Sequence, residues 1–109
     1  MRIVFYKAER NDTNISISIC LEDGKLQFDG YDYGARVKEF RGISDEFEYY
    51  LNLDEANTTK AFEALGISSK SDQEKLELIR DKFSKDGSFR GFEKYCAEHG
   101  IETKYSSWP

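Results

Sequence analysis

The sequence predicts an α+β domain: an antiparallel β-sheet, made of an N-terminal meander, a fourth strand and a C-terminal strand, with about three helices packed on one face. Three observations lead to this fold class. Apolar and polar residues alternate through the first half of the chain, the second half changes to helical spacing, and strong turn pairs separate the first segments. With 109 residues, the chain is expected to form a single domain, 1–109, that buries its own core.

The first segments predict a meander of strands. Residues 2–8 are rich in β-branched and aromatic side chains, and the Asn-Asp pair at 11–12 indicates a turn. Isoleucines alternate with small polar residues over 14–21, which is typical of a strand with one buried face. The Asp-Gly pair at 23–24 tolerates positive φ and predicts a two-residue hairpin, after which 25–28 returns antiparallel.

The middle of the chain predicts turns followed by a fourth strand. Gly30 and Gly34 bracket a stretch rich in Asp and Gly, which we expect to form two turns. Residues 37–40 fit either one helical turn or a short strand, and residues 42–45 fit a loop. Apolar and polar residues alternate again over 47–53, so this strand is expected to bury one face.

Start and stop signals predict the first two helices. Asp54 is the expected N-cap of a helix that runs to about Leu65 and ends at Gly66 in the left-handed conformation. Ser71 and Glu74 have the spacing of a capping box, which indicates the start of a second helix. The residues expected on the buried stripe of this second helix are Leu76, Ile79 and Phe83.

A third helix and a closing strand complete the prediction. The second helix is expected to stop at Gly87, and Ser88 is the expected N-cap of a third helix that ends at Gly100. Residues 101–108 then predict a final strand, with Ile101, Thr103 and Tyr105 in register. The inner face of the third helix is expected to consist of Phe89, Phe92, Tyr95 and Cys96.

The net charge of −5 is concentrated in one stretch of the chain. Residues 22–55 contain ten acidic and four basic side chains, whereas the rest of the chain contains eleven acidic and twelve basic ones. Nucleic acid is therefore disfavoured as a partner, because phosphate contacts require clustered Lys and Arg. The acidic stretch favours attraction to a basic protein surface, or else serves solubility alone.

The remaining composition predicts a cytoplasmic protein without a membrane span. The chain has no apolar run of about eighteen residues, and the first ten residues lack the features of a signal peptide. Cys20 and Cys96 lie far apart in apolar surroundings, so both are expected to be buried, reduced thiols.

No motif in the chain indicates a cofactor or a reaction. An EF-hand loop that began at Asp29 would need an oxygen ligand at its third position and a glutamate at its twelfth. These positions hold Tyr31 and Phe40, so the calcium pattern fails. Cys96 and His99 have the spacing of two zinc ligands on a helix, but the chain has a single His and offers no complete ligand set. Nothing marks a nucleophile activated by a base. We therefore expect no cofactor, no metal and no enzymatic activity.

Tyrosines and carboxylates cluster between the second hairpin turn and the first helix. Tyrosine provides a large contact area at low entropic cost, and carboxylates steer a cationic partner, so this cluster fits a binding surface. The alternative is that the tyrosines cover turns or enter the core and the acids only solvate the surface. The candidate partner-binding residues are Asp29, Tyr31, Asp32, Tyr33, Glu46, Glu48 and Tyr50.

The chain resembles known proteins in several segments. These are Asp29-Gly-x-Asp-x-Gly34, Phe40-x-Gly42, Glu46-Phe-Glu-Tyr49 and His99-Gly-Ile101 through Trp108, and together they resemble a group of small bacterial proteins. In size, acidity and layout the chain is also similar to immunity proteins of contact-dependent growth inhibition and related polymorphic toxin systems. This resemblance implies a cytoplasmic, non-enzymatic inhibitor that covers a toxin domain, often a basic nuclease. It carries over no binding residues.

The favoured hypothesis is therefore an immunity-type protein that binds and neutralises a toxin domain, a basic nuclease by expectation, through its acidic, tyrosine-rich surface. The alternative is a small cytoplasmic protein-binding or regulatory module with another partner. Such a module would use the exposed face of the sheet, or an edge such as the terminal strand.

Overall fold

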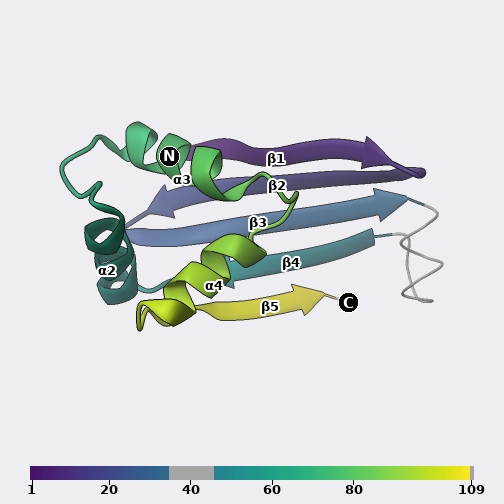
Figure 1. The fold of residues 1–109 in the computed structure, drawn as a ribbon. Coiled ribbons are helices and arrows are strands. Elements are labelled where there is room, and N and C mark those ends of the chain that lie inside the picture. The colour runs from purple at the N-terminus through teal and green to yellow at the C-terminus, as the bar shows by residue number, and fades with distance from the viewer. Residues whose placement is uncertain (35–45, 109) are drawn as a thin grey trace.

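The structure is a computed structural model that describes residues 1–34 and 46–108. Its sheet has five antiparallel strands in the order β1-β2-β3-β4-β5, so neighbours in sequence are neighbours in space. The helices lie on one face of this sheet (Figure 1), which confirms the predicted α+β class. The elements are β1 (Arg2–Arg10), β2 (Thr13–Glu22), β3 (Lys25–Gly34), β4 (Glu46–Asn52), α2 (Glu55–Leu65), α3 (Asp72–Phe83), α4 (Arg90–Glu98) and β5 (Lys104–Trp108).

Two-residue turns join the first three strands, as predicted. At the first turn Asn11 and Asp12 have φ of 48° and 63°, and at the second Asp23 and Gly24 have φ of 52° and 75°. Positive φ at both central residues gives the turn a twist that matches the twist of the flanking strands. The two turns therefore set the register of the whole meander.

The predicted turns between Asp29 and Gly34 are wrong, because β3 continues through this stretch to Gly34. Asp29 is paired on one side with Ser18 of β2 and on the other with Tyr50 of β4. Backbone pairing on both sides satisfies the peptide groups of the segment, and this outweighs the turn preference of its Asp and Gly residues. The predictions for 37–40 and 42–45 lie outside the described residues.

Gly30 is required for packing in the middle of β3. It lies directly across from Tyr49 of β4, and the aromatic ring of Tyr49 lies over it. A Cβ atom added at Gly30 would come within 2.0 Å of this ring. The glycine thus makes room for an aromatic side chain on the helix-covered face of the sheet.

The core lies between the sheet and the helices. Phe28 of β3 is fully buried at its centre, with its ring 5.1 Å from that of Phe5, 5.6 Å from that of Phe89 and 5.1 Å from that of Phe92. The core thus joins β1, β3 and the α4 region in a single cluster. Other buried members include Ile17, Ile19, Leu26, Leu51, Leu76, Ile79 and Cys96.

The first two helices start where predicted. Asp54 caps α2 by accepting a hydrogen bond from the backbone N–H of Asn57 at 2.8 Å, and Gly66 ends the helix with φ of 72°. Ser71 caps α3 by accepting from the N–H of Glu74 at 3.2 Å. However, α3 ends at Phe83, before the predicted stop at Gly87.

The third helix and the last strand are shorter than predicted. Phe89 occupies the N-cap position of α4 without a side-chain bond, whereas the predicted cap, Ser88, accepts from the N–H of Arg90 at 3.2 Å. The strand β5 begins at Lys104, and Ile101 is buried in the connection that precedes it. These two elements exist as predicted, but their boundaries move by a few residues.

A buried asparagine ties the connection before β5 to the start of α2. The side-chain amide of Asn57 donates to Asp54 at 2.9 Å, and its carbonyl oxygen accepts from the backbone N–H of Glu102 at 2.9 Å. Asn57 is buried, so both of its polar groups need these partners. This contact fixes the chain where it enters β5.

Replacing Gly30 by Ala should lower the free energy of unfolding by about 1–3 kcal/mol, because the new methyl group overlaps the Tyr49 ring. The matched control is Gly91→Ala in α4, where a Cβ would lie 3.7 Å from the nearest atom, on Phe83, an ordinary contact. The control should leave stability unchanged or raise it by up to about 1 kcal/mol. Urea unfolding of both variants checks the prediction, and equal effects would contradict it.

Candidate protein-binding face

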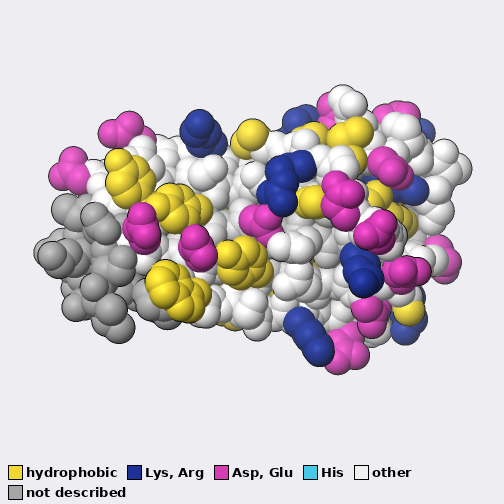
Figure 2. All heavy atoms as spheres, turned by 180° about the vertical axis from the view of Figure 1, so that it is seen from behind, with side chains coloured by type: hydrophobic (Ala, Val, Ile, Leu, Met, Phe, Trp, Pro, Cys, Tyr) yellow, Lys and Arg dark blue, Asp and Glu magenta, His cyan; other side chains and the backbone are white. Residues whose placement is uncertain are grey.

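The sheet has a second face that the described helices do not cover, here called the open face. Successive side chains of a strand point to opposite sides, so every second residue of each strand belongs to it. Figure 2 views the molecule from this side and shows hydrophobic and acidic side chains interleaved over the half that adjoins the grey segment. The residues of the open face that bear on binding are Arg2, Val4, Asp29, Tyr31, Tyr33, Glu46, Glu48, Tyr50 and Trp108.

All the predicted partner-binding residues except Asp32 lie on this face, on the adjacent strands β3 and β4. Three cross-strand pairs bring each phenol next to a carboxylate. These pairs are Tyr31 with Glu48, Tyr33 with Glu46, and Tyr50 with Asp29. The residues of a cross-strand pair have Cβ atoms about 4.5–5.5 Å apart, so phenols and carboxylates alternate within a continuous patch.

The phenol hydroxyls also bond to the neighbouring carboxylates. Tyr31 donates to Glu46 at 2.9 Å, and Tyr50 donates to Glu48 at 3.0 Å. The rings of Tyr31 and Tyr33 stack with centroids 6.2 Å apart. The hydrogen bond to Glu48 raises the pKa of the Tyr50 phenol. In this patch, therefore, two of the phenol hydroxyls are hydrogen-bonded to carboxylates of β4.

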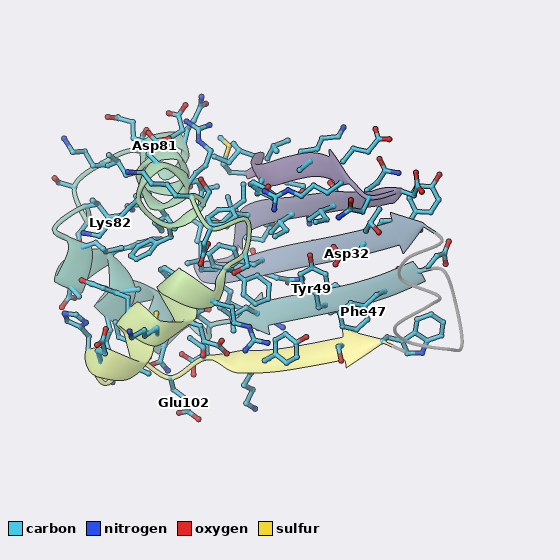
Figure 3. The ribbon with its side chains drawn as sticks, turned by 45° about the vertical axis from the view of Figure 1, so that its right-hand side comes forward. Asp32, Phe47, Tyr49, Asp81, Lys82 and Glu102 are labelled. Atoms are coloured by element: carbon cyan, nitrogen blue, oxygen red, sulfur yellow. The ribbon has the colours of Figure 1, made fainter. Side chains whose placement is uncertain are left out.

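Asp32 is separated from the other predicted residues, because it lies on the helix-covered side of β3. There its carboxylate accepts a hydrogen bond from the Tyr49 hydroxyl at 2.7 Å (Figure 3). Burial raises the pKa of the Tyr49 phenol, and the bond to Asp32 raises it further. The prediction of turns in this stretch places Asp32 among the partner-binding residues together with its neighbours. In a strand it shares the orientation of Phe28 and Gly30.

Asp29 is already paired within the protein. Arg2 of β1 forms an ion pair with one of its oxygens at 2.7 Å, and the side-chain amide of Gln27 donates to the other. The hydrogen bond to Asp29 raises the pKa of the Arg2 guanidinium. The Arg2 cation thus offsets part of the negative potential that Asp29 adds to the open face.

Sequence reasoning missed two apolar members of the open face, Trp108 and Val4. The Trp108 side chain is 63% exposed and lies across from Glu48, and Val4 is 56% exposed. The predicted last strand has Ile101, Thr103 and Tyr105 in register, which already gives Trp108 the opposite orientation. Its position beside Glu48 needed the strand order, which the sequence pattern does not contain.

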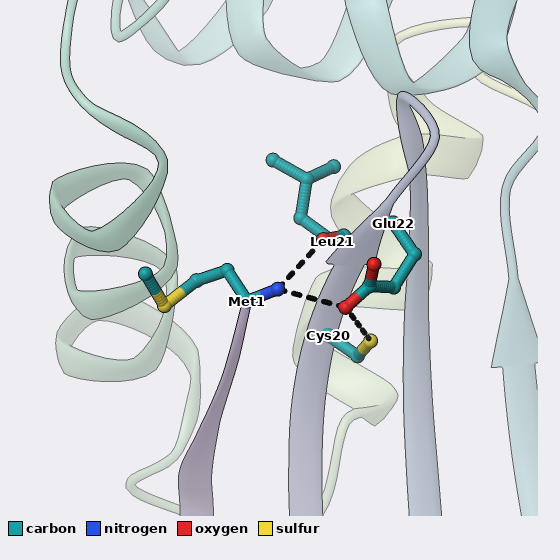
Figure 4. Close-up of polar contacts among 4 residues, drawn as sticks. All are labelled: Met1, Cys20, Leu21 and Glu22. Atoms are coloured by element: carbon teal, nitrogen blue, oxygen red, sulfur yellow. Dashed lines mark hydrogen bonds and ion pairs between the residues drawn. The ribbon is translucent and has the colours of Figure 1, made fainter.

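The end of the open face near the second hairpin has its own polar contacts (Figure 4). The Met1 amino group bonds to Glu22 at 2.8 Å and to the Leu21 carbonyl at 3.2 Å, and the Cys20 sulfur lies 4.0 Å from Glu22. The bond from the amino group lowers the pKa of Glu22. The negative charge of Glu22 is thus compensated locally.

Both cysteines are buried and free, in agreement with the prediction. Burial raises the pKa of the Cys96 thiol to about 12, so this thiol is neutral and part of the core. His99 is exposed, and its ring stacks on Tyr95 with centroids 4.0 Å apart. Its Nδ1 lies 2.8 Å from the Tyr95 carbonyl oxygen. The two residues considered as zinc ligands thus have other surroundings: Cys96 lies in the core, and His99 packs against Tyr95.

Within residues 1–34 and 46–108, no three or more His, Cys, Asp or Glu side chains come together in a way that could hold a metal ion. None of the described helices combines the length and the apolar character needed to cross a membrane. A scan against protein-family models, a search of curated proteins and a search of solved structures found no match.

The contact between Tyr49 and Asp32 should give the protein a specific pH dependence. The pKa of the Tyr49 phenol is higher in the folded protein than in the unfolded chain, where it is about 10. The contribution of this phenol to stability is therefore complete below pH of about 10 and declines as the pH rises further. Tyr49→Phe should cost about 1 kcal/mol at neutral pH, and the stability difference from the original protein should shrink above pH of about 10.

The matched control is Tyr33→Phe, which removes the same hydroxyl from a side chain that is 46% exposed on the opposite face. Denaturant unfolding at a series of pH values measures both differences. A stability difference for Tyr49→Phe that stays constant through pH of about 11 would exclude the proposed coupling.

Proposed function

We propose that this chain is an immunity-type protein of the cytoplasm, which binds a basic toxin domain through the open face and thereby neutralises it. The observation that carries the proposal is the placement of Tyr31, Tyr33, Glu46, Glu48 and Tyr50 on one side of two adjacent strands. Such a face offers aromatic contact area and negative charge at the same place. It therefore suits a partner whose surface is cationic.

The rigidity of the sheet supports this role. Side chains on paired strands are held in position by the backbone ladder, so less conformational entropy is lost on binding than on a flexible loop. The hydroxyl–carboxylate bonds of Tyr31 and Tyr50 fix the rings further. Residues Glu46 and Glu48 would bond Lys and Arg side chains of the toxin domain.

The proposed inhibition is steric and electrostatic. A nuclease binds its phosphate backbone through clustered Lys and Arg, and a carboxylate-bearing surface competes for those same cations. The aromatic rings then exclude water from the contact, which strengthens the charge pairs. The chain needs no catalytic group for this action.

Charge reversal tests the proposed face. The double variant Glu46→Lys with Glu48→Lys should weaken binding to the proposed basic toxin domain by at least about tenfold, and should reduce the salt dependence of association. Isothermal titration calorimetry and stopped-flow association at several salt concentrations measure both quantities.

The matched control is Glu63→Lys with Glu98→Lys, which makes the same change in net charge at exposed positions on α2 and α4. This control should keep most of the affinity, because the substituted residues lie in the helical layer. Equal losses for the two double variants would mean that net charge alone matters and that the open face is not the contact.

Two substitutions at Tyr50 distinguish the contribution of its aromatic ring to binding from that of its hydroxyl group. Tyr50→Ala should weaken the complex by about 30-fold or more, as expected for an anchor residue, whereas Tyr50→Phe should keep most of the affinity because the ring remains. Dissociation rates from surface plasmon resonance provide the measurement. An alanine variant that binds like the original chain would remove Tyr50 from the interface.

The same face also fits the alternative function, a protein-binding or regulatory module for another cationic partner. The two functions differ in the partner's chemistry and share the contact residues. Co-expression with the neighbouring reading frame separates them, since an immunity-type protein restores the growth of cells that produce the toxin domain. Growth arrest that persists despite stable expression of both chains favours the alternative.

A further inference from the structure

The two edges of the sheet differ in how they are protected. The edge strand β1 has an irregularity between Val4 and Tyr6, and charged side chains at both ends, all of which discourage pairing with another strand. The opposite edge strand, β5, pairs with β4 in a continuous register and is exposed along its whole length. Figure 1 shows that the described helices leave the outer edge of β5 uncovered.

The hydrogen-bond pattern shows which groups of β5 face this edge. Leu53 N–H donates to the Leu26 carbonyl at 2.9 Å, at the end of the ladder between β3 and β4. In an antiparallel ladder, successive residues of a strand direct their backbone groups to opposite sides. Because Leu53 bonds to β3, Tyr50, three residues earlier, directs its backbone groups away from β3 and toward β5. Its partner there is Ser106. The backbone groups of Tyr105 and Ser107 consequently point to the outer edge.

We propose that two copies of this chain associate through this edge, with β5 of one copy pairing antiparallel with β5 of the other about a two-fold axis at Ser106. In this register Tyr105 of each copy lies across from Ser107 of the second copy. These are the residues whose N–H and C=O groups face outward, so each such pair exchanges two backbone hydrogen bonds.

The side chains of β5 are complementary in this arrangement. Lys104 of one copy lies across from Trp108 of the second copy, in a non-hydrogen-bonded pair, where side chains approach most closely. An ammonium group and an indole ring at this spacing form a cation–π contact. The two copies of Lys104 lie at opposite ends of the paired strands, and only the small Ser106 side chains meet at the axis.

The association would join two five-stranded sheets into one continuous sheet. Both open faces would then lie on the same side, because a two-fold axis perpendicular to the sheet preserves its sidedness. The contact is confined to the five residues of β5, so it is expected to be weak and to depend on protein concentration. This inference is independent of the proposed function, because it is tested without a toxin domain.

Sedimentation equilibrium from about 10 μM to about 1 mM, at about 0.15 M salt, is the direct test. The average mass should rise from the 12.7 kDa of one chain toward twice that value as concentration increases. Over the same range the fluorescence of Trp108, the single tryptophan, should change as its indole becomes covered. A mass of one chain throughout would overturn the proposal.

Ser107→Pro makes the test specific. Proline removes an N–H that faces only the outer edge, so the variant should stay monomeric while it keeps the circular dichroism and unfolding midpoint of a folded domain. The matched control, Ser107→Ala, keeps the N–H and should associate like the original chain. Should Ser107→Pro fail to fold, Trp108→Ala provides a second test, with weaker association expected. Association that persists in folded Ser107→Pro, or in Trp108→Ala at full strength, would contradict pairing through β5.

Discussion

The pleat of β3 is the constraint on which the rest of the structure depends. This strand lies at the centre of the sheet, and its side chains alternate between two environments. On one side Phe28 organises the core and Gly30 makes room for the Tyr49 ring. On the other side Tyr31 and Tyr33 reach solvent. A shift of one residue would exchange these two sets, so the core and the open face are specified by the same register.

The core and the open face compete for the same aromatic residues, and the alternation resolves this competition. Tyr49 and Tyr50 are neighbours in sequence, yet the first is half-buried against Gly30 and Asp32, whereas the second bonds to Glu48 on the open face. An aromatic-rich chain of this size can therefore hold a compact core and still present phenol rings to solvent. Carboxylates beside those rings keep the exposed surface hydrated in the absence of a partner.

Local chemistry predicted the fold well where one signal determined the conformation. The turn at Asp23-Gly24 and the cap at Asp54 are examples, since each requires backbone geometry that few residues adopt or stabilise. Prediction failed at 29–34, where the turn preference of Asp and Gly was outweighed by pairing with strands on both sides. The placement of Asp32 failed for the same reason. The position of Trp108 on the open face was not predicted, because it depends on strand order, which is set by long-range contacts.

Hydroxyl-radical footprinting, applied to the free chain and to its complex with the proposed toxin domain, is the decisive measurement for the open face, because it reports side-chain exposure residue by residue. We expect Tyr31, Tyr33 and Tyr50 to be oxidised in the free chain and protected in the complex, while His99 and Leu78 in the helical layer react equally in both. Protection of the helical layer, with the tyrosines of the open face reacting as before, would contradict it.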